Sequence, residues 1–81
     1  MPKVKIYFSQ ILCPCYIMAK NYFKKSKVDF VEIDASKDKS ALYEMVKKSG
    51  QIYIAVIEIY GKIIVGFNPK EIDRLLMAYN T

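Results

Sequence analysis

The chain has 81 residues, with 13 lysine and arginine residues against 8 aspartate and glutamate residues, and a formal net charge of +5 at pH 7. A chain of this length predicts a single small domain, which we place at residues 1–81 and which can bury a modest core. It contains no histidine, which excludes the commonest transition-metal ligand and the usual proton shuttle at neutral pH. The lysines are scattered among acidic residues after Asp29, so we expect a solvated surface and no nucleic-acid partner.

No apolar run approaches the roughly 20 residues of a membrane span, and the first residues lack the pattern of a signal peptide. We therefore expect a cytoplasmic protein with no membrane partner. In that reducing compartment, neighbouring cysteines are more often redox-active or metal-binding than structural. The two cysteines, Cys13 and Cys15, would close too small a loop for a bridge between them to hold the fold together.

The first part of the sequence predicts a strand, a helix and a second strand. Residues 3–8 form a β-branched and aromatic run, which is typical of a strand. Pro14 suits the first position of a helix, which would place Cys13 at the N-cap and carry the helix to about Lys25. Residues 28–33 are again rich in β-branched and aromatic side chains. A strand–helix–strand unit of this kind predicts a parallel, right-handed connection.

A second helix is expected next, with Ser36 or Asp38 as its N-cap and Gly50 in the left-handed conformation at its end. Its apolar positions form one stripe, made of Ala41, Leu42, Met45 and Val46.

Residues 52–60 and 63–65 read as two strands, and the pair Tyr60 and Gly61 between them predicts a tight hairpin with antiparallel strands. Asn68 and Pro69 then have the residue types of an N-cap and a first helical position, so a last helix packs back on the sheet. The predicted order is β-α-β-α-β-β-α. This order indicates an α/β sandwich around a four-stranded mixed sheet.

The segments VKIY at 4–7, VDFVEID at 28–34, MVKKSGQ at 45–51 and GKIIVGF at 61–67 make the chain resemble a glutaredoxin. The resemblance runs from about Lys3 to Met77. Within the family, the chain is similar to the short bacterial glutaredoxin-like redoxins. It implies a thioredoxin-like fold and a thiol–disulfide oxidoreductase with Cys13 as nucleophile. It also implies glutathione as the cofactor, and a disulfide-containing protein or a glutathione mixed disulfide as the partner.

The sequence departs from the glutaredoxin pattern at the active site. Glutaredoxins carry Cys-Pro-Tyr-Cys or a close variant, whereas Cys15 stands here at the tyrosine position and Tyr16 at that of the resolving cysteine. Ala55 occupies the place of the family's cis-proline. The resemblance assigns glutathione contacts to the backbone beside that position, at Ile54, and to the segment containing Gly66 and Asn68.

Cys13 keeps a physical reason to be reactive, because the free N–H groups and dipole at a helix N-terminus stabilise a thiolate. Cys15 is the second candidate catalytic thiol. Side chains two residues apart on a helix point about 160° apart, so Cys15 should point away from Cys13. We therefore expect Cys13 to act alone, or to be an inert exposed thiol that does not act at all. The pair could instead bind a soft ion such as Cu(I) or zinc, although two thiolates only half fill a tetrahedral site.

A second hypothesis is that the former active-site face has become an apolar interface for a partner protein or for a homodimer. Exposed apolar patches that contain tyrosine are typical of interaction surfaces. The alternative for Ile17 and Ile54 is that they are ordinary core residues. The departures from the family pattern are typical of a remodelled scaffold, and we leave natural and engineered origins open. The residues of this predicted patch are Ile11, Leu12, Tyr16, Ile17, Tyr53 and Ile54.

Overall fold

The computed structural model describes residues 4–9, 14–51 and 54–79. Among these residues, three helices and four strands form in the order predicted from the sequence. In the described part of the chain, no helix has the length and apolar character needed to cross a membrane. The elements are β1 (Val4–Phe8), α1 (Pro14–Lys25), β2 (Val31–Asp34), α2 (Lys39–Ser49), β3 (Val56–Ile59), β4 (Lys62–Val65) and α3 (Pro69–Tyr79).

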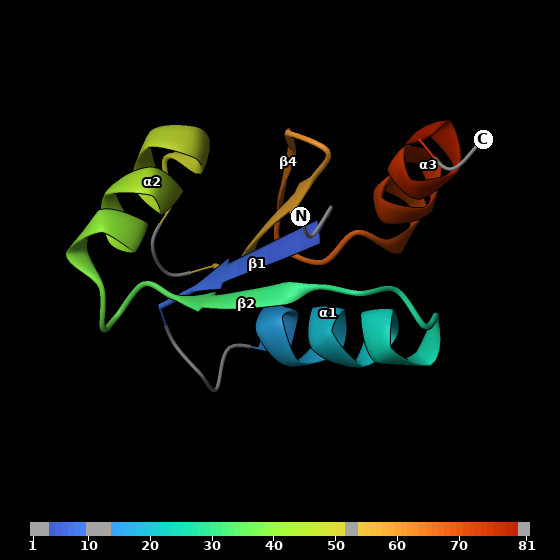
Figure 1. Cartoon of the computed structure of the whole chain (residues 1–81), viewed down its shortest axis with the longest axis horizontal. Helices are drawn as coiled ribbons and strands as arrows, with labels where there is room; N and C mark the ends of the chain where they lie inside the picture. The colour runs from blue at the N-terminus through green and yellow to red at the C-terminus, as the bar shows by residue number, and fades with distance from the viewer. Residues whose placement is uncertain (1–3, 10–13, 52–53, 80–81) are drawn as a thin grey trace.

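The four strands form one mixed sheet in the order β2-β1-β3-β4. β1 pairs with β2 in parallel, whereas the β1–β3 and β3–β4 pairs are antiparallel. Ile6 of β1 lies opposite both Glu32 and Ile57. The two central strands, β1 and β3, supply most of the buried side chains of the sheet. Helices α1 and α2 lie on opposite sides of the sheet (Figure 1).

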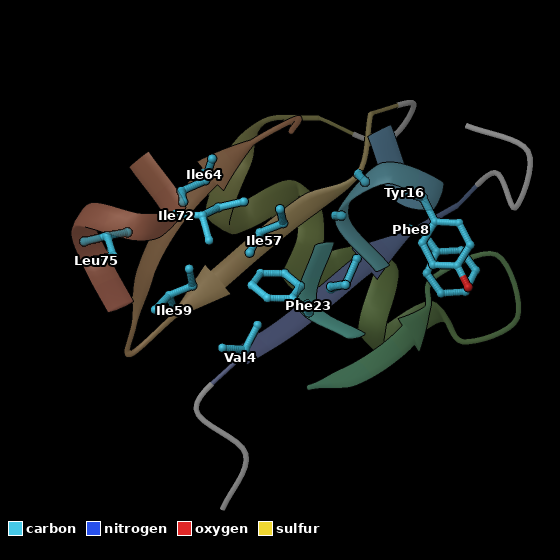
Figure 2. Packing of buried hydrophobic residues seen from close by; sticks show 12 residues of the cluster. Val4, Phe8, Tyr16, Phe23, Ile57, Ile59, Ile64, Ile72 and Leu75 are labelled. Atoms are coloured by element: carbon cyan, nitrogen blue, oxygen red, sulfur yellow. The ribbon is translucent and has the colours of Figure 1, made fainter. Parts of the chain in front are cut away.

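The larger core lies between the sheet and helices α1 and α3. Side chains of β1, β3 and β4 meet Tyr16, Ala19 and Phe23 of α1 and Ile72 and Leu75 of α3 (Figure 2). A smaller cluster on the other face joins the sheet to α2, where Met45 is fully buried. Both faces of the sheet are thus covered, as the predicted sandwich requires.

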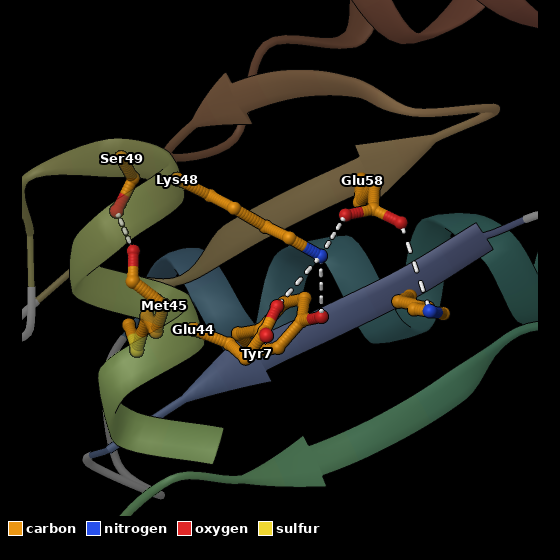
Figure 3. A network of polar contacts seen from close by, with 7 residues as sticks. Tyr7, Glu44, Met45, Lys48, Ser49 and Glu58 are labelled. Carbon is orange, nitrogen blue, oxygen red and sulfur yellow. Dashed lines mark hydrogen bonds and ion pairs between the residues drawn. The ribbon is translucent and has the colours of Figure 1, made fainter. Parts of the chain in front are cut away.

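A polar contact also fastens α2 to the sheet. Lys48 donates to Glu58 of β3 at 2.6 Å and to the hydroxyl of Tyr7 at 3.0 Å (Figure 3). Glu44 lies 3.3 Å from the same ammonium group, and Lys5 lies 3.7 Å from Glu58. We call Tyr7, Glu44, Lys48 and Glu58 the Lys48 cluster.

The predicted second strand at residues 28–33 is wrong at its start, because pairing begins only at Val31, opposite Lys5. The preceding residues complete the end of α1 instead. Val28 N–H donates to Phe23 C=O and Lys27 N–H to Lys24 C=O, while Lys27 has a φ of 58°. These are the bonds of a Schellman motif, which fixes residues 26–28 at the helix end.

The third strand is also shorter than predicted. It covers Val56–Ile59, and residues 52–53 of the predicted run lie outside the described residues. The hairpin that follows is confirmed. Tyr60 and Gly61 both have positive φ, at 49° and 85°, as a two-residue type I′ turn requires.

The helix boundaries agree with the predicted caps. Asp38, rather than Ser36, caps α2, because its Oδ1 accepts from Ser40 N–H at 2.9 Å. Gly50 ends α2 with a φ of 72°. Asn68 Oδ1 accepts from Glu71 N–H at 3.2 Å at the start of α3. On α2 the apolar stripe is narrower than predicted, since Ala41 and Met45 are buried, Leu42 is partly buried and Val46 is exposed.

Candidate functional site

Three segments that are distant in sequence meet at one end of the molecule. They are the first turn of α1, the residues just before β3, and the connection from β4 to α3. A Cβ added at Gly66 would lie 3.5 Å from Ile54 Cγ2 and 3.9 Å from Cys15 Sγ. The fold therefore brings together three of the residues that the sequence singled out: Cys15, Ile54 and Gly66.

Gly66 has a backbone reason to be glycine. Its φ is 81°, in the left-handed region, and its N–H donates to the carbonyl of Ala55 at 2.8 Å. Ala55 itself is buried, and no cis peptide bond occurs among the described residues. The position predicted for the family's cis-proline thus packs directly on the β4–α3 connection.

Cys15 is a free, partly exposed thiol, and its spacing of about two helical turns from Tyr22 places both side chains on one flank of α1. On the same flank, the Tyr22 ring lies 5.6 Å from that of Phe67 in an edge-to-face arrangement, and its hydroxyl donates to Asp73 of α3. Cys15 therefore belongs to the surface that joins α1 to the last helix.

Cys13 lies outside the described residues, as do Ile11, Leu12 and Tyr53. The start of the helix is described. α1 begins at Pro14, as predicted, and its first turn contains no acidic side chain. Among the described residues, no three cysteine, aspartate or glutamate side chains are grouped to hold a metal ion. The Cys13–Cys15 metal hypothesis stays a prediction because one of its ligands is not described.

The prediction that Tyr16 belongs to an exposed patch is wrong. Its side chain is only 5 % exposed and stacks on Phe8, with ring centroids 4.1 Å apart. Its hydroxyl donates to Glu32 Oε1 at 2.6 Å. The reason is the helix period, since Tyr16, Ala19 and Phe23 share the face of α1 that packs on the sheet.

The other two described members of the predicted patch are exposed. Ile17 is 42 % and Ile54 37 % exposed, so the alternative of fully buried core residues is wrong for both. Ile17 is two residues from Cys15 and lies about 160° around α1 from it. Ile54 and Cys15 both lie beside Gly66. Ile17 therefore lies on the opposite flank of α1 from Ile54.

A charged cluster that sequence reasoning missed surrounds the Tyr16 hydroxyl. Lys20 Nζ lies 3.2 Å from Glu32 Oε1 and 5.6 Å from the centre of the Tyr16 ring. Burial is the main cause that raises the pKa of Tyr16, and the hydrogen bond to Glu32 raises it further. The same hydrogen bond lowers the pKa of Glu32. The i, i+4 spacing of Tyr16 and Lys20 was visible in the sequence, but their meeting with Glu32 depends on the β1–β2 pairing. We call Tyr16, Lys20 and Glu32 the Tyr16 cluster.

The residues predicted to contact glutathione fit the tripeptide only in part. Gly66 has no side chain but is itself buried, whereas Ile54 is exposed, so only the Ile54 part of this segment is open to solvent. Asn68 uses its side-chain oxygen to cap α3. Lys5 and Lys20 are paired with Glu58 and Glu32, so neither ammonium group is a free source of positive charge for an anionic ligand.

Comparison with known proteins agrees with this architecture. No protein-family model matches the chain. The chain is 42% identical over 73 residues, covering 90% of its length and 96% of the relative, to an uncharacterized glutaredoxin-like 8.6 kDa protein in the rubredoxin operon of Clostridium pasteurianum.

Two solved structures are similar in fold. The thioredoxin-like protein BC3987 is 26% identical, with a TM-score of 0.80, and the match covers 91% of this chain and 100% of that protein. A glutaredoxin from Archaeoglobus fulgidus also has a TM-score of 0.80, at 23% identity, and the match covers 94% of this chain and 87% of that one. The second likeness concerns the fold alone.

Proposed function

This chain belongs to the glutaredoxin-like family of thioredoxin-fold proteins, and from that membership we propose that it is a thiol–disulfide oxidoreductase with Cys13 as its nucleophile. The family and the fold support a redox protein in general. The observation that carries the specific proposal is the start of α1 at Pro14. Cys13 directly precedes this residue in sequence, where unpaired N–H groups and the helix dipole favour a thiolate.

The proposed reaction begins with a disulfide between a protein thiol and glutathione. The Cys13 thiolate attacks the glutathione sulfur, the original S–S bond breaks, and the protein sulfur leaves as a thiolate that takes a proton from water. A second glutathione thiolate then attacks that same glutathione sulfur, now bonded to Cys13, which releases the Cys13 thiolate and glutathione disulfide. Each turnover thus consumes one added glutathione, and the glutathione that entered with the substrate leaves in the glutathione disulfide.

Neither neighbouring side chain is suited to resolving the mixed disulfide. Tyr16 stands at the fourth position of the motif and has no thiol, and Cys15 packs beside Gly66. This arrangement supports a single-cysteine route in which an outside thiol completes the cycle. Gly66 and Ile54 would then border the glutathione part of the mixed disulfide.

The test compares Cys13→Ser with Cys15→Ser as a matched control. Turnover of a glutathionylated peptide is followed through the oxidation of NADPH by added glutathione reductase. We expect Cys13→Ser to fall to the uncatalysed background and Cys15→Ser to keep most of the wild-type rate. Turnover that survives in Cys13→Ser would contradict the proposal.

The thiol itself gives a second, independent measurement. The pH dependence of alkylation of Cys13 in the Cys15→Ser variant should have its midpoint below the value of about 8.5 for a free cysteine. A midpoint at or above that value would remove the physical basis of the proposal.

The interface hypothesis keeps part of its support. Ile17 and Ile54 are exposed, as an interface requires, but they lie on different flanks of α1, and Tyr16 is buried and cannot act as the aromatic anchor. Sedimentation at increasing protein concentration tests self-association. A reversible dimer that is lost in Ile54→Lys would support the interface, and a protein that stays monomeric at millimolar concentration would leave a homodimer without support.

A further inference from the structure

We propose that the outer face of α1 is a docking surface for an acidic segment of a partner protein. Apolar side chains of that segment pack on Ile17 and Met18, and its carboxylates pair with Lys24 and Lys25. Such docking goes beyond the thiol chemistry proposed above and does not depend on it. The outer α1 face, as we use the name, consists of Ile17, Met18, Asn21, Lys24 and Lys25.

The outer α1 face is open to solvent. Ile17 is 42% and Met18 46% exposed, and the other three residues of the face are exposed as well. The opposite side of the helix packs on the sheet through Tyr16, Ala19 and Phe23. No other described helix or strand covers α1 on its side away from the sheet (Figure 1). A partner can therefore reach this face without any rearrangement of the fold.

The apolar and basic residues of this face form two parallel rows along the helix. Side chains seven residues apart on a helix differ by about 20° in direction and lie about 10 Å apart along its axis. Ile17 and Lys24 form one such pair, and Met18 and Lys25 form the other. Each row thus begins with an exposed apolar side chain and ends with an ammonium group. A complementary segment has an apolar side chain and a carboxylate at the same separation of about 10 Å.

The charge of α1 favours an acidic occupant. The helix contains three lysines and no acidic residue, whereas α3 contains two basic and two acidic residues. Lys20 is paired with Glu32, and Lys24 attracts the same carboxylate only from beyond ion-pair distance. Within the described residues, Lys24 and Lys25 form no ion pair. Their ammonium groups therefore remain available to carboxylates of a partner, and such charge complementarity speeds and directs association.

Other occupants fit this face less well. A second copy of the chain supplies no carboxylate from its own outer α1 face. A nucleic acid contacts lysines through its phosphates, which leave Ile17 and Met18 uncovered. An anionic membrane takes up a helix whose apolar stripe faces outward, whereas the apolar stripe of α1 is turned to the sheet. An acidic protein segment supplies both the carboxylates and the apolar contacts.

The experiment titrates a short helical probe peptide into the isotope-labelled full chain at low salt and follows the amide signals by NMR. The peptide carries two leucines and two glutamates, with each glutamate two helical turns after a leucine. We expect a saturable shift of the amide signals of α1. A second peptide with glutamine in place of both glutamates should bind about fivefold more weakly, because it loses two exposed charge pairs.

Paired substitutions separate the outer α1 face from the net charge of the protein. Lys24→Glu with Lys25→Glu should weaken binding of the acidic peptide about tenfold, because two attractions become repulsions. Lys39→Glu with Lys47→Glu is the matched control, since both lysines are exposed on α2 and the net charge changes equally; its affinity should stay within about twofold of that of the Lys24→Gln and Lys25→Gln control-free wild type. Lys24→Gln with Lys25→Gln removes the charges without placing carboxylates at the C-terminal end of α1, and it should weaken binding about fivefold.

The proposal is overturned if the acidic peptide gives no saturable shift, or if the glutamate and glutamine peptides bind equally well. Equal losses in the α1 and α2 charge variants would also overturn it, because the peptide would then respond to net charge alone. So would a single-stranded oligonucleotide that binds α1 more tightly than the acidic peptide does. None of these measurements uses turnover, so their outcome is separate from that of the Cys13→Ser test of the proposed function.

Discussion

Lys48 of α2 and Glu58 of β3 form a hydrogen-bonded ion pair of 2.6 Å beneath the helix. The carboxylate is mostly shielded, with 14% of its side chain exposed, against 29% for the lysine. Tyr7 adds a third partner, since its hydroxyl accepts from the same ammonium group. This contact joins the end of α2 to the two central strands, on the face of the sheet away from α1.

The first prediction concerns the stability that this contact provides. Lys48→Met should lower the free energy of unfolding by about 1–2 kcal/mol, because it leaves Glu58 with only Lys5, while partial exposure screens part of the loss. Lys47→Met is the control, since Lys47 is exposed on the same helix. Urea denaturation should show little change for it. Equal losses in the two variants would mean that the ion pair contributes nothing specific.

The second prediction is a dependence of stability on pH that originates at Glu32. The hydrogen bond from Tyr16, with help from Lys20, lowers the pKa of this carboxyl in the folded protein. A group with a lowered folded pKa stabilises the protein above its unfolded pKa, near 4.3, and loses that contribution as the pH falls through the folded value. The wild-type protein should therefore lose stability below about pH 4.3, and Glu32→Gln should lose less over the same range.

The difference between the wild-type and Glu32→Gln curves of stability against pH gives the contribution of Glu32, separate from that of the other acidic groups. Glu44→Gln serves as the control on α2, because Glu44 is exposed and lies outside the Tyr16 cluster. Its acid dependence should follow that of the wild type. Parallel curves for wild type and Glu32→Gln would show that the Tyr16 hydrogen bond does not favour the ionised carboxylate.

The sequence predicted the features that depend on local chemistry. Pro14 marked the start of α1, Gly50 the end of α2 and Asn68 the cap of α3, because each acts on the backbone within one turn of its own position. The order of elements followed from these boundaries and from the apolar runs. The family resemblance added the thioredoxin-like fold, which the comparisons confirm.

The features that the sequence missed depend on contacts between distant segments. The motif around Tyr16 predicts a place on the surface, whereas its stack on Phe8 and its hydrogen bond to Glu32 hold it in the core. The start of β2 was placed three residues early because Val28 and Phe30 have strand-like side chains. They pack against the core without pairing with β1, and neither fact is visible from residue type alone.

The third prediction uses the end of α1. Lys27 has a φ of 58°, a conformation that costs an ordinary residue about 1 kcal/mol and glycine almost nothing. Lys27→Gly should therefore raise the free energy of unfolding, by about 0.5–1 kcal/mol once the greater freedom of glycine in the unfolded chain is counted. Lys25→Gly, at the last residue of α1, should lower it, because glycine is disfavoured at helical positions. Stabilities that change in the same direction would contradict the Schellman assignment.

The fourth prediction concerns Gly66, where the candidate site and the fold meet. A Cβ at this position would meet Ile54 and Cys15 at 3.5 and 3.9 Å, which are ordinary contact distances, so steric overlap is not the obstacle. The φ of 81° is the obstacle, and Gly66→Ala should cost about 1–2 kcal/mol of stability. Gly61 has a similar φ of 85° in the hairpin at the other end of β4, and Gly61→Ala should cost a similar amount.

The two glycine variants should therefore have similar stability but a different KM for substrate. Gly66→Ala places a methyl group beside Cys15 and Ile54, whereas Gly61→Ala leaves that corner unchanged. If glutathione binds along Gly66, the first variant should raise the KM for a glutathionylated peptide while the second leaves it near the wild-type value. An equal KM in both variants would mean that the methyl group meets no substrate, and the binding surface would then have to lie away from the β4–α3 connection.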